Sequence, residues 1–308
     1  MASTLELSSG SVFISVSRGF LLVKRDTEEQ KIPLADLDCV ILSSPAVSIS
    51  SQAMSRLAEE NIPIIHCGKN AMPIAMTLAY ADNVYRKERV MRQIDTSLPL
   101  KKRLWQQIVR AKIQNQGSVI SLIGAKANEF IIFADKTLSG DSGNMEAVAA
   151  RRYWGRLFGK GFKRDPEEPG RNSLLNYGYA ILRAAVARSI VGAGLIPDLG
   201  LEHCNMMNPY CLADDLMEPY RPLIDLCVWS MFLSDGTELS PINKRILITM
   251  LEIELVLEGN HASMRNCVDT SVRSYVRSLY NKKTEIIYPG IDEETAKLLK
   301  EVIINARK

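Results

Sequence analysis

The chain has 308 residues and a net charge of +3, and 46% of its residues are hydrophobic, which is enough for one large domain or two moderate ones. It has no run of 18 or more apolar residues, so no membrane span is expected, and the segment after Met1 lacks the basic and apolar regions of a signal peptide. The six cysteines form no CxxC pair, which argues against a zinc ribbon or redox motif and favours reduced thiols in a cytoplasmic protein.

The first part of the chain alternates short apolar runs with turn residues, a pattern that predicts strands. Residues 50–60 interrupt this pattern with apolar side chains at helical spacing. We therefore predict a small sandwich-like domain over residues 1–84. Its expected strands lie at residues 12–16, 20–23, 39–42, 63–66 and 73–78.

From Arg86 onward the apolar residues recur at helical spacing. The first long helix is expected to end at Gln116, because Gly117 follows it. The further expected helices cover residues 118–137, 144–159, 172–194, 208–232, 241–258, 263–280 and 292–306. The predicted fold class is α+β, with a small N-terminal β-sandwich-like domain (1–84) followed by a larger all-α catalytic domain (85–308).

The charge is distributed unevenly along the chain. Residues 1–85 carry a net charge of −3, residues 86–194 carry +11, and residues 195–308 carry −5. A basic surface attracts a phosphate backbone without regard to its sequence. Solvated helix faces also carry Lys and Arg, so charge alone leaves nucleic-acid binding and an ordinary protein surface equally open.

Two carboxylates in the acidic third are candidates for chemistry. Asp215 and Glu218 are three residues apart, so they share one helix face. Carboxylates stacked in this way repel each other unless a cation lies between them, and Mg²⁺ or Mn²⁺ prefers such oxygen ligands. A solvated acidic face is the commoner explanation for a bare DxxE. Asn208 is a candidate N-cap for this helix, and Pro219 predicts that the helix kinks or ends beside the carboxylates.

Other candidate residues lie before this helix. His203 follows Gly200 in a loop, where a histidine is more often a surface residue than a metal ligand or proton carrier. Glu146 stands in the first turn of a helix, a position that the helix dipole alone favours. His66 and His261 fit ordinary surroundings and are assigned no chemistry.

Basic and aromatic residues alternate just after Glu146, which suits binding a phosphate chain and stacking on exposed bases. In the alternative interpretation, the aromatic residues of this segment belong to the core. The candidate DNA-binding residues are Arg151, Arg152, Lys160, Lys163 and Arg164.

Four sequence blocks occur in a specific order: 176–183 (NYGYAILR), 194–197 (GLIP), 200–203 (GLEH) and 215–222 (DLMEPYRP). This series resembles the CRISPR-associated spacer-acquisition integrases, over nearly the whole chain. The short N-terminal region and the block that begins with Glu146 look most like the members from type II systems. The resemblance implies an N-terminal β domain and a C-terminal helical domain, in agreement with the predicted elements.

The resemblance also implies the chemistry. It assigns Glu146, His203 and Glu218 as ligands of Mg²⁺ or Mn²⁺ and Asp215 as a nearby second carboxylate, although Asp214 leaves open which aspartate faces the site. In such an integrase, the 3′-hydroxyl of an incoming double-stranded DNA fragment attacks the CRISPR repeat, and the fragment becomes a spacer for antiviral defence in a prokaryotic cytoplasm. The family works as a homodimer together with a small ferredoxin-like CRISPR adaptation protein.

Two alternatives stay open. One is a structure-specific metal nuclease without integrase activity, which would cut DNA but give no branched product. The other is a DNA-binding scaffold that keeps the fold without catalysis, against which the presence of Glu146, His203 and Glu218 argues.

Overall fold

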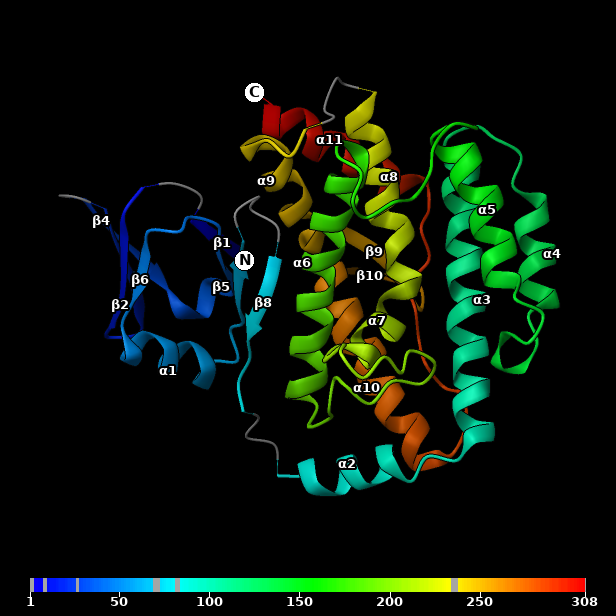
Figure 1. The fold of residues 1–308 in the computed structure, drawn as a ribbon, viewed down its shortest axis with the longest axis horizontal. Coiled ribbons are helices and arrows are strands. Elements are labelled where there is room, and N and C mark those ends of the chain that lie inside the picture. Colours follow the sequence, from blue (N-terminus) through cyan, green and yellow to red (C-terminus); the bar gives the residue numbers. More distant parts are fainter. Residues whose placement is uncertain are drawn as a thin grey trace. The chain divides into compact units, whose positions relative to one another are not determined.

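The structure is a computed structural model, and it describes residues 3–7, 10–25, 28–68, 73–80, 84–233 and 238–307. The chain divides into two compact units, Met1–Val84 and Tyr85–Lys308 (Figure 1). The first unit is rich in strands and the second is largely helical.

The first unit contains two four-stranded sheets. One has the order β1 (Ser3–Leu7), β5 (Leu37–Leu42), β7 (Ile64–Cys67) and β8 (Pro73–Thr77). The other has the order β4 (Glu28–Pro33), β3 (Phe20–Arg25), β2 (Val12–Ser17) and β6 (Val47–Ile49). Helix α1 (Ser51–Glu59) begins where the Ser50 hydroxyl accepts a hydrogen bond from the Ala53 amide, which is the usual role of an N-cap serine.

Both sheets and α1 contribute to one hydrophobic core. Ile14 of β2, Val40 of β5 and Leu57 of α1 are fully buried members of this cluster. The expectation of a sandwich-like domain with one helix is therefore confirmed. The sequence did not reveal β4, because this strand (EEQKIP) is exposed along most of its length and lacks an apolar run.

The second unit contains ten α-helices among its described residues. They are α2 (Arg86–Ile94), α3 (Leu98–Leu122), α4 (Asn128–Lys136), α5 (Met145–Leu157), α6 (Arg171–Gly192), α7 (Cys211–Met217), α8 (Arg221–Phe232), α9 (Pro241–Thr249), α10 (Met264–Asn281) and α11 (Glu293–Arg307). Helix α3 packs against α4, α5 and α8, and α6 packs against α7, α8, α9 and α10 (Figure 1). In the part of the chain that is described, no helix is long and apolar enough to cross a membrane.

Helix α3 is continuous through Gly117, so the predicted break at this residue is wrong. A Cβ atom at Gly117 would lie 2.9 Å from the Cβ of Phe130 in α4. The glycine therefore permits the close packing of α4 on α3, and the surrounding buried contacts offset its low helix propensity. Trp105 and Lys112 both lie on α3, before this glycine.

A second prediction, a helix over residues 241–258, is wrong beyond Thr249. A short 3-10 segment and a hairpin of β9 (Glu254–Leu257) and β10 (Asn260–Ser263) follow instead. The turn has positive φ at both Glu258 and Gly259, which is the geometry of a two-residue hairpin turn.

Pro219 interrupts the helix that carries the acidic residues, as predicted. Helix α7 ends at Met217, a 3-10 turn η3 covers Glu218–Tyr220, and α8 starts at Arg221. The predicted cap at Asn208 is wrong, because α7 begins at Cys211 and its cap residue, Tyr210, makes no side-chain cap bond.

Candidate active site

Glu146 stands at the start of α5 because the preceding turn places it there. The Asp141 carboxylate accepts hydrogen bonds from the amides of Met145 (2.8 Å) and Glu146 (3.0 Å). Asp141 and Asn144 both have positive φ, which tightens the turn before the helix. The cap thus fixes the first turn of α5 and leaves the Glu146 side chain directed to other partners.

Lys112, in the middle of α3, contacts two candidate carboxylates at once. Its Nζ lies 2.6 Å from Oε1 of Glu146 and 2.5 Å from Oε2 of Glu218. Burial lowers the pKa of Lys112, but the negative charges of Glu218 and Glu146 more than offset this, so the net pKa lies above its usual value. The amine is therefore a protonated ammonium that joins α5, α3 and η3.

Glu218 is almost completely buried, with 3% of its surface exposed. The η3 turn that carries it is tied to α3, because the Asn115 side-chain amide donates to the Pro219 carbonyl at 2.7 Å. Arg221 Nε lies 3.0 Å from Glu218 Oε1. Burial raises the pKa of the Glu218 carboxyl, but Arg221 and Lys112 lower it to a net value below its usual one. Glu218 is thus an anion between two cations.

His203 is held by Asp215, which is fully buried in α7. Asp215 Oδ1 lies 2.6 Å from Nδ1 of the imidazole, and the same carboxylate accepts hydrogen bonds from the amides of Leu201, Glu202 and His203 at 2.6–3.3 Å. The hydrogen bond to Asp215 raises the pKa of His203 above its usual value, against the opposite effect of burial, and the charge of Glu218 adds to the increase. The arrangement fixes the ring and directs Nε2 away from Asp215.

The loop can close over Asp215 only because residue 200 is glycine. A Cβ atom at Gly200 would lie 2.3 Å from the His203 carbonyl oxygen and 2.8 Å from Asp215 Oδ2. On the other side, the Trp105 ring of α3 meets the His203 ring edge-on, with centroids 6.0 Å apart. Backbone, carboxylate and aromatic contacts therefore hold the imidazole in one place.

The two neighbouring aspartates have different partners. Asp214 Oδ1 lies 2.6 Å from Arg183 Nε, and its Oδ2 accepts a hydrogen bond from the Asn208 side chain at 2.7 Å. Asp215 alone of the two contacts His203. Between the alternatives left open by the sequence, the structure places Asp215 beside the histidine.

The side chains present fit a hard divalent cation. Glu218 Oε2 is buried and has no hydrogen bond of good geometry, despite its short ion-pair distance to Lys112. A buried carboxylate oxygen without a hydrogen bond is available to bind a metal cation. Glu146 and Glu218 offer oxygen atoms and His203 offers Nε2, a donor set compatible with Mn²⁺ and tolerable for Mg²⁺. Within the described ranges, no three His, Cys, Asp or Glu side chains already converge as a metal cage.

A cavity of about 740 Å³ opens beside His203. Its lining includes Lys101, Cys204, Met206 and Met207, and the two methionine residues are 97% and 88% exposed. The imidazole thus borders a space large enough for part of a substrate.

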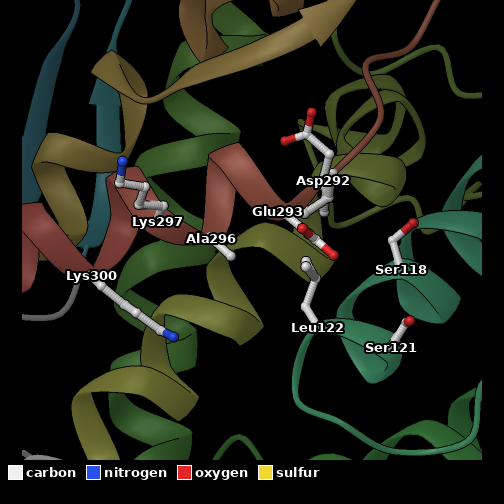
Figure 2. A pocket seen from close by; sticks show the side chains of 9 residues that line it. Ser118, Ser121, Leu122, Asp292, Glu293, Ala296, Lys297 and Lys300 are labelled. Carbon is white, nitrogen blue, oxygen red and sulfur yellow. The ribbon is translucent and has the colours of Figure 1, made fainter.

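A second cavity, of about 510 Å³, lies between α3 and the start of α11 (Figure 2). Asp292, just before α11, and Glu293, in its first turn, line one side, while Ser118 and Ser121 line the other from α3 (Figure 2). Ser118 is six residues beyond Lys112 on α3, or about 9 Å by helical rise. Of the described side chains that line this cavity, none belongs to the candidate active site.

The predicted DNA-binding residues fall into two groups. Arg151, Arg152, Lys160 and Lys163 are exposed. Arg164 is half-buried and donates hydrogen bonds to the side-chain oxygens of Asn172 and Asn176, at 2.9 and 2.6 Å.

The aromatic residues beside the basic side chains are divided in the same way. Tyr153 is buried in the core, together with the aliphatic Leu157. Trp154 and Phe158 are half-buried and stack on each other, with an interplanar angle of 11°.

The histidine and cysteine residues outside the site have ordinary partners. His66 Nε2 lies 2.9 Å from the Thr77 hydroxyl, and the exposed His261 lies 3.7 Å from a Glu294 oxygen. None of the six cysteines forms a disulfide, and four of them are buried, as expected for thiols that serve packing.

Sequence reasoning missed Lys112, Arg221, Asp141 and the role of Gly200. Arg221 could have been identified, because it stands three residues after Glu218 on the same helical face. Asp141 lies four to five residues before the amides that it caps, outside the usual N-cap spacing. No local pattern marks Lys112, because its partners come from two distant segments of the chain.

The chain is similar to known proteins along most of its length. The family model "CRISPR associated protein Cas1" matches residues 6–240. The CRISPR-associated endonuclease Cas1 of Neisseria meningitidis serogroup C (strain 8013) is 37% identical over 277 residues, which cover 88% of this chain and 90% of that protein. The corresponding protein of Francisella tularensis subsp. novicida is 28% identical over 243 residues, which cover 70% of this chain and 74% of that one.

Solved structures show the same fold. A casposase bound to its integration product superposes with a TM-score of 0.78 at 20% identity, covering 98% of this chain and 99% of the casposase. A Cas1 protein from Thermotoga maritima gives a TM-score of 0.75 at 16% identity, covering 94% of this chain and all of that one. With the family model matching most of its length and a relative above one third identical, this chain belongs to the Cas1 family of CRISPR-associated proteins.

Proposed function

We propose that this protein is a metal-dependent integrase and endonuclease that inserts DNA fragments as spacers into a CRISPR array, with Glu146, His203 and Glu218 as its metal ligands. As a member of the Cas1 family, the chain is a nuclease and integrase of CRISPR adaptation. The site assignment rests on the contacts of its side chains. Glu146 of α5 and Glu218 of η3 both contact the Lys112 ammonium. Asp215 holds His203 by a hydrogen bond, and the negative charge of Glu218 helps to raise the pKa of this histidine.

The reaction is a transesterification. The 3′-hydroxyl of the incoming DNA attacks a phosphodiester at the edge of a repeat, and the 3′-oxygen of the existing strand leaves. A divalent ion bound here would polarise the scissile phosphate and lower the pKa of the attacking hydroxyl. With water as the nucleophile, the same site would hydrolyse DNA.

Each side chain of the site has a role that its contacts support. Glu146 and Glu218 supply anionic oxygens from two elements that α3 holds together. His203 would supply Nε2, because Asp215 contacts Nδ1 and orients the ring. Arg221 balances the charge of Glu218 from its other oxygen, so this acid stays ionised despite its burial.

The family and the charge pattern support the proposed substrate and assembly. The exposed Arg151, Arg152, Lys160 and Lys163 would hold the phosphate backbone in line for attack. One similar solved structure is a Cas6-RT-Cas1–Cas2 complex, with a TM-score of 0.73 at 21% identity over 94% of this chain and 36% of that one. The proposed assembly is a homodimer that works with a small ferredoxin-like adaptation protein on double-stranded DNA in the prokaryotic cytoplasm.

A strand-transfer assay tests the proposal. A duplex with free 3′-hydroxyls is incubated with a plasmid that carries a repeat array and with Mn²⁺ or Mg²⁺. The wild-type protein should give branched product, and EDTA should abolish the product while gel-shift binding to DNA persists. Glu146→Ala, His203→Ala and Glu218→Ala should each abolish joining, whereas His66→Ala and His261→Ala should leave it intact.

The same assay separates the two alternatives. Cleavage without branched product would make the protein a nuclease only. DNA binding without cleavage or joining, together with unaltered Mn²⁺ affinity in the three site variants, would make it a scaffold and would show that the metal site is misassigned.

A further inference from the structure

Lys112 occupies the position between the two glutamates of the site. Its ammonium contacts one oxygen of each, Glu146 Oε1 at 2.6 Å and Glu218 Oε2 at 2.5 Å. The Lys112 side chain is only 13% exposed, and that of Glu218 is 4% exposed. The three side chains come from α3, α5 and η3, so the contact is built by the tertiary fold and not by neighbours in sequence.

The two contacts of the ammonium differ in quality. The contact to Glu146 is a hydrogen bond, whereas that to Glu218 Oε2 is close without hydrogen-bond alignment. Arg221 pairs with the other oxygen of Glu218. Glu218 therefore has two cationic partners, one on each oxygen. Arg221 contacts Glu218 alone of the two glutamates, whereas Lys112 lies between Glu218 and Glu146.

We propose that Lys112 is a displaceable cation that holds the metal-binding carboxylates together in the metal-free protein and must leave them when a divalent ion binds. This inference rests on the proposed function, because it takes Glu146 and Glu218 as metal ligands. The assignment of Glu146 and Glu218 as metal ligands does not say which cation lies between them in the metal-free protein.

Charge and space support the exchange. Without a cation, the two carboxylates would face each other and repel. A divalent ion held by Glu146 and Glu218 would compete with Nζ for the carboxylate oxygens that the ammonium now contacts. A nearby ammonium would also repel the ion. The flexible four-carbon stem of lysine lets Nζ move aside while α3 stays in place.

The test compares Lys112→Met with Lys102→Met in calorimetric Mn²⁺ titrations and in thermal melts with EDTA. Both substitutions remove one positive charge from α3 and keep an unbranched apolar stem, but Lys102 is exposed and ten residues away. Lys112→Met should bind Mn²⁺ roughly tenfold more tightly than wild type, because the ion no longer competes with a buried ammonium. It should also melt lower in EDTA and gain more stability from Mn²⁺. Lys102→Met should resemble the wild type in all three measurements.

A double-mutant cycle guards against a folding defect in Lys112→Met. Adding Glu146→Gln removes the repulsion that Lys112 otherwise relieves, so the Lys112→Met/Glu146→Gln protein should melt higher in EDTA than Lys112→Met. Lys112→Arg keeps the charge and should bind Mn²⁺ no more tightly than wild type.

Failures of the two proposals give different results. If Glu218→Gln loses Mn²⁺ binding but Lys112→Met binds Mn²⁺ as weakly as wild type or more weakly, the displacement inference is overturned and the metal site stands. Purely additive melting effects in the double-mutant cycle would overturn it as well. If Glu218→Gln binds Mn²⁺ like wild type, the proposed metal site itself is wrong, and the inference falls with it.

Discussion

Asp215 and His203 form the most constrained pair of the site, with 2.6 Å between Asp215 Oδ1 and His203 Nδ1. The aspartate is fully buried, whereas the histidine side chain is 42% exposed. A buried carboxylate thus orients a side chain that is partly exposed to solvent. Carboxylates that orient metal-bound histidines in this way tune the affinity of the site without touching the ion.

Replacing Asp215 should therefore weaken metal binding more than it changes the fold. Asp215→Asn keeps one acceptor oxygen but places an amide group among the N–H donors of residues 201–203. We expect Mn²⁺ affinity and strand transfer to fall by about 10–100-fold, measured by calorimetry and by branched product. Asp214→Asn is the matched control, because it breaks the contact with Arg183 and leaves His203 held. Equal losses of Mn²⁺ affinity in both variants would contradict the distinction between the two aspartates.

Replacing Gly200 should reduce strand transfer about as much as replacing a metal ligand does. A methyl group at this position would collide with the His203 carbonyl and the Asp215 carboxylate, so Gly200→Ala must open the loop. We expect His203 to lose its fixed position and strand transfer to fall by about 100-fold or more, since small displacements of catalytic groups carry costs of that order.

Gly155→Ala is the control for this substitution. Gly155 lies within α5, and a Cβ atom there would meet nothing within 4 Å. Alanine should raise the free energy of unfolding by about 0.5–1 kcal/mol, because glycine is the poorer helix former, with strand transfer unchanged. Full activity in Gly200→Ala would show that the loop tolerates the methyl group and that the close contact is not required.

The sequence predicted the parts of this molecule that depend on local pattern. The change from strands to helices and the break at Pro219 both follow from residue spacing and backbone restriction. The interpretation of Gly117 as a helix end was wrong because its reason lies in α4, which packs against that glycine. The same limit explains why Lys112 was missed: the partners that give it a role, Glu146 and Glu218, lie 34 and 106 residues further along the chain.

The prediction of the site residues depended on the order of several sequence motifs more than on residue spacing. A bare DxxE favours a solvated acidic face, yet Asp215 and Glu218 are buried. Their burial is possible because backbone amides surround Asp215 and because Lys112 and Arg221 lie beside Glu218. The sequence cannot show these partners before the fold brings them together.

The affinity for DNA should fall as the salt concentration rises, and the exposed basic residues of the 151–163 segment should set the slope of this fall. In the variant with Arg151, Arg152, Lys160 and Lys163 all changed to Glu, the log–log dependence of affinity on salt should become flatter, by about 0.9 for each phosphate that the protein no longer neutralises. Affinity for all DNA sequences should fall, as expected when side chains bind the phosphate backbone.

Arg164→Gln should behave differently from the quadruple variant. Its guanidinium is already bonded to Asn172 and Asn176, so the substitution should lower the melting temperature and leave the salt slope nearly unchanged. Filter binding over a range of salt concentrations measures the slope. An unchanged slope in the quadruple variant would place the DNA-binding surface elsewhere on the protein.

Asp225 should make the stability of the protein depend on pH in the direction opposite to most carboxylates. This side chain of α8 is buried and accepts hydrogen bonds from the hydroxyls of Tyr153 (3.0 Å) and Tyr179. Burial raises its pKa to about 7, although both tyrosines lower it in part. Between pH 4 and 7 the folded protein therefore keeps a proton on Asp225 that the unfolded chain releases, so the contribution of Asp225 to stability falls as pH rises.

Chemical denaturation of the wild type and Asp225→Asn at several pH values measures this contribution. Because asparagine does not titrate, the free energy of unfolding of the wild type relative to the variant should fall by about 3 kcal/mol from pH 4 to pH 7, most steeply between the two pKa values, at about 1.4 kcal/mol for each pH unit. Tyr153→Phe removes one hydrogen bond that lowers the pKa of Asp225, so it should extend the fall to higher pH. A difference between wild type and Asp225→Asn that stays constant over this range would mean that Asp225 is ionised in the folded protein at pH 4. The two tyrosine hydroxyls and the nearby positive charges of Arg221 and Arg164 would then outweigh its burial.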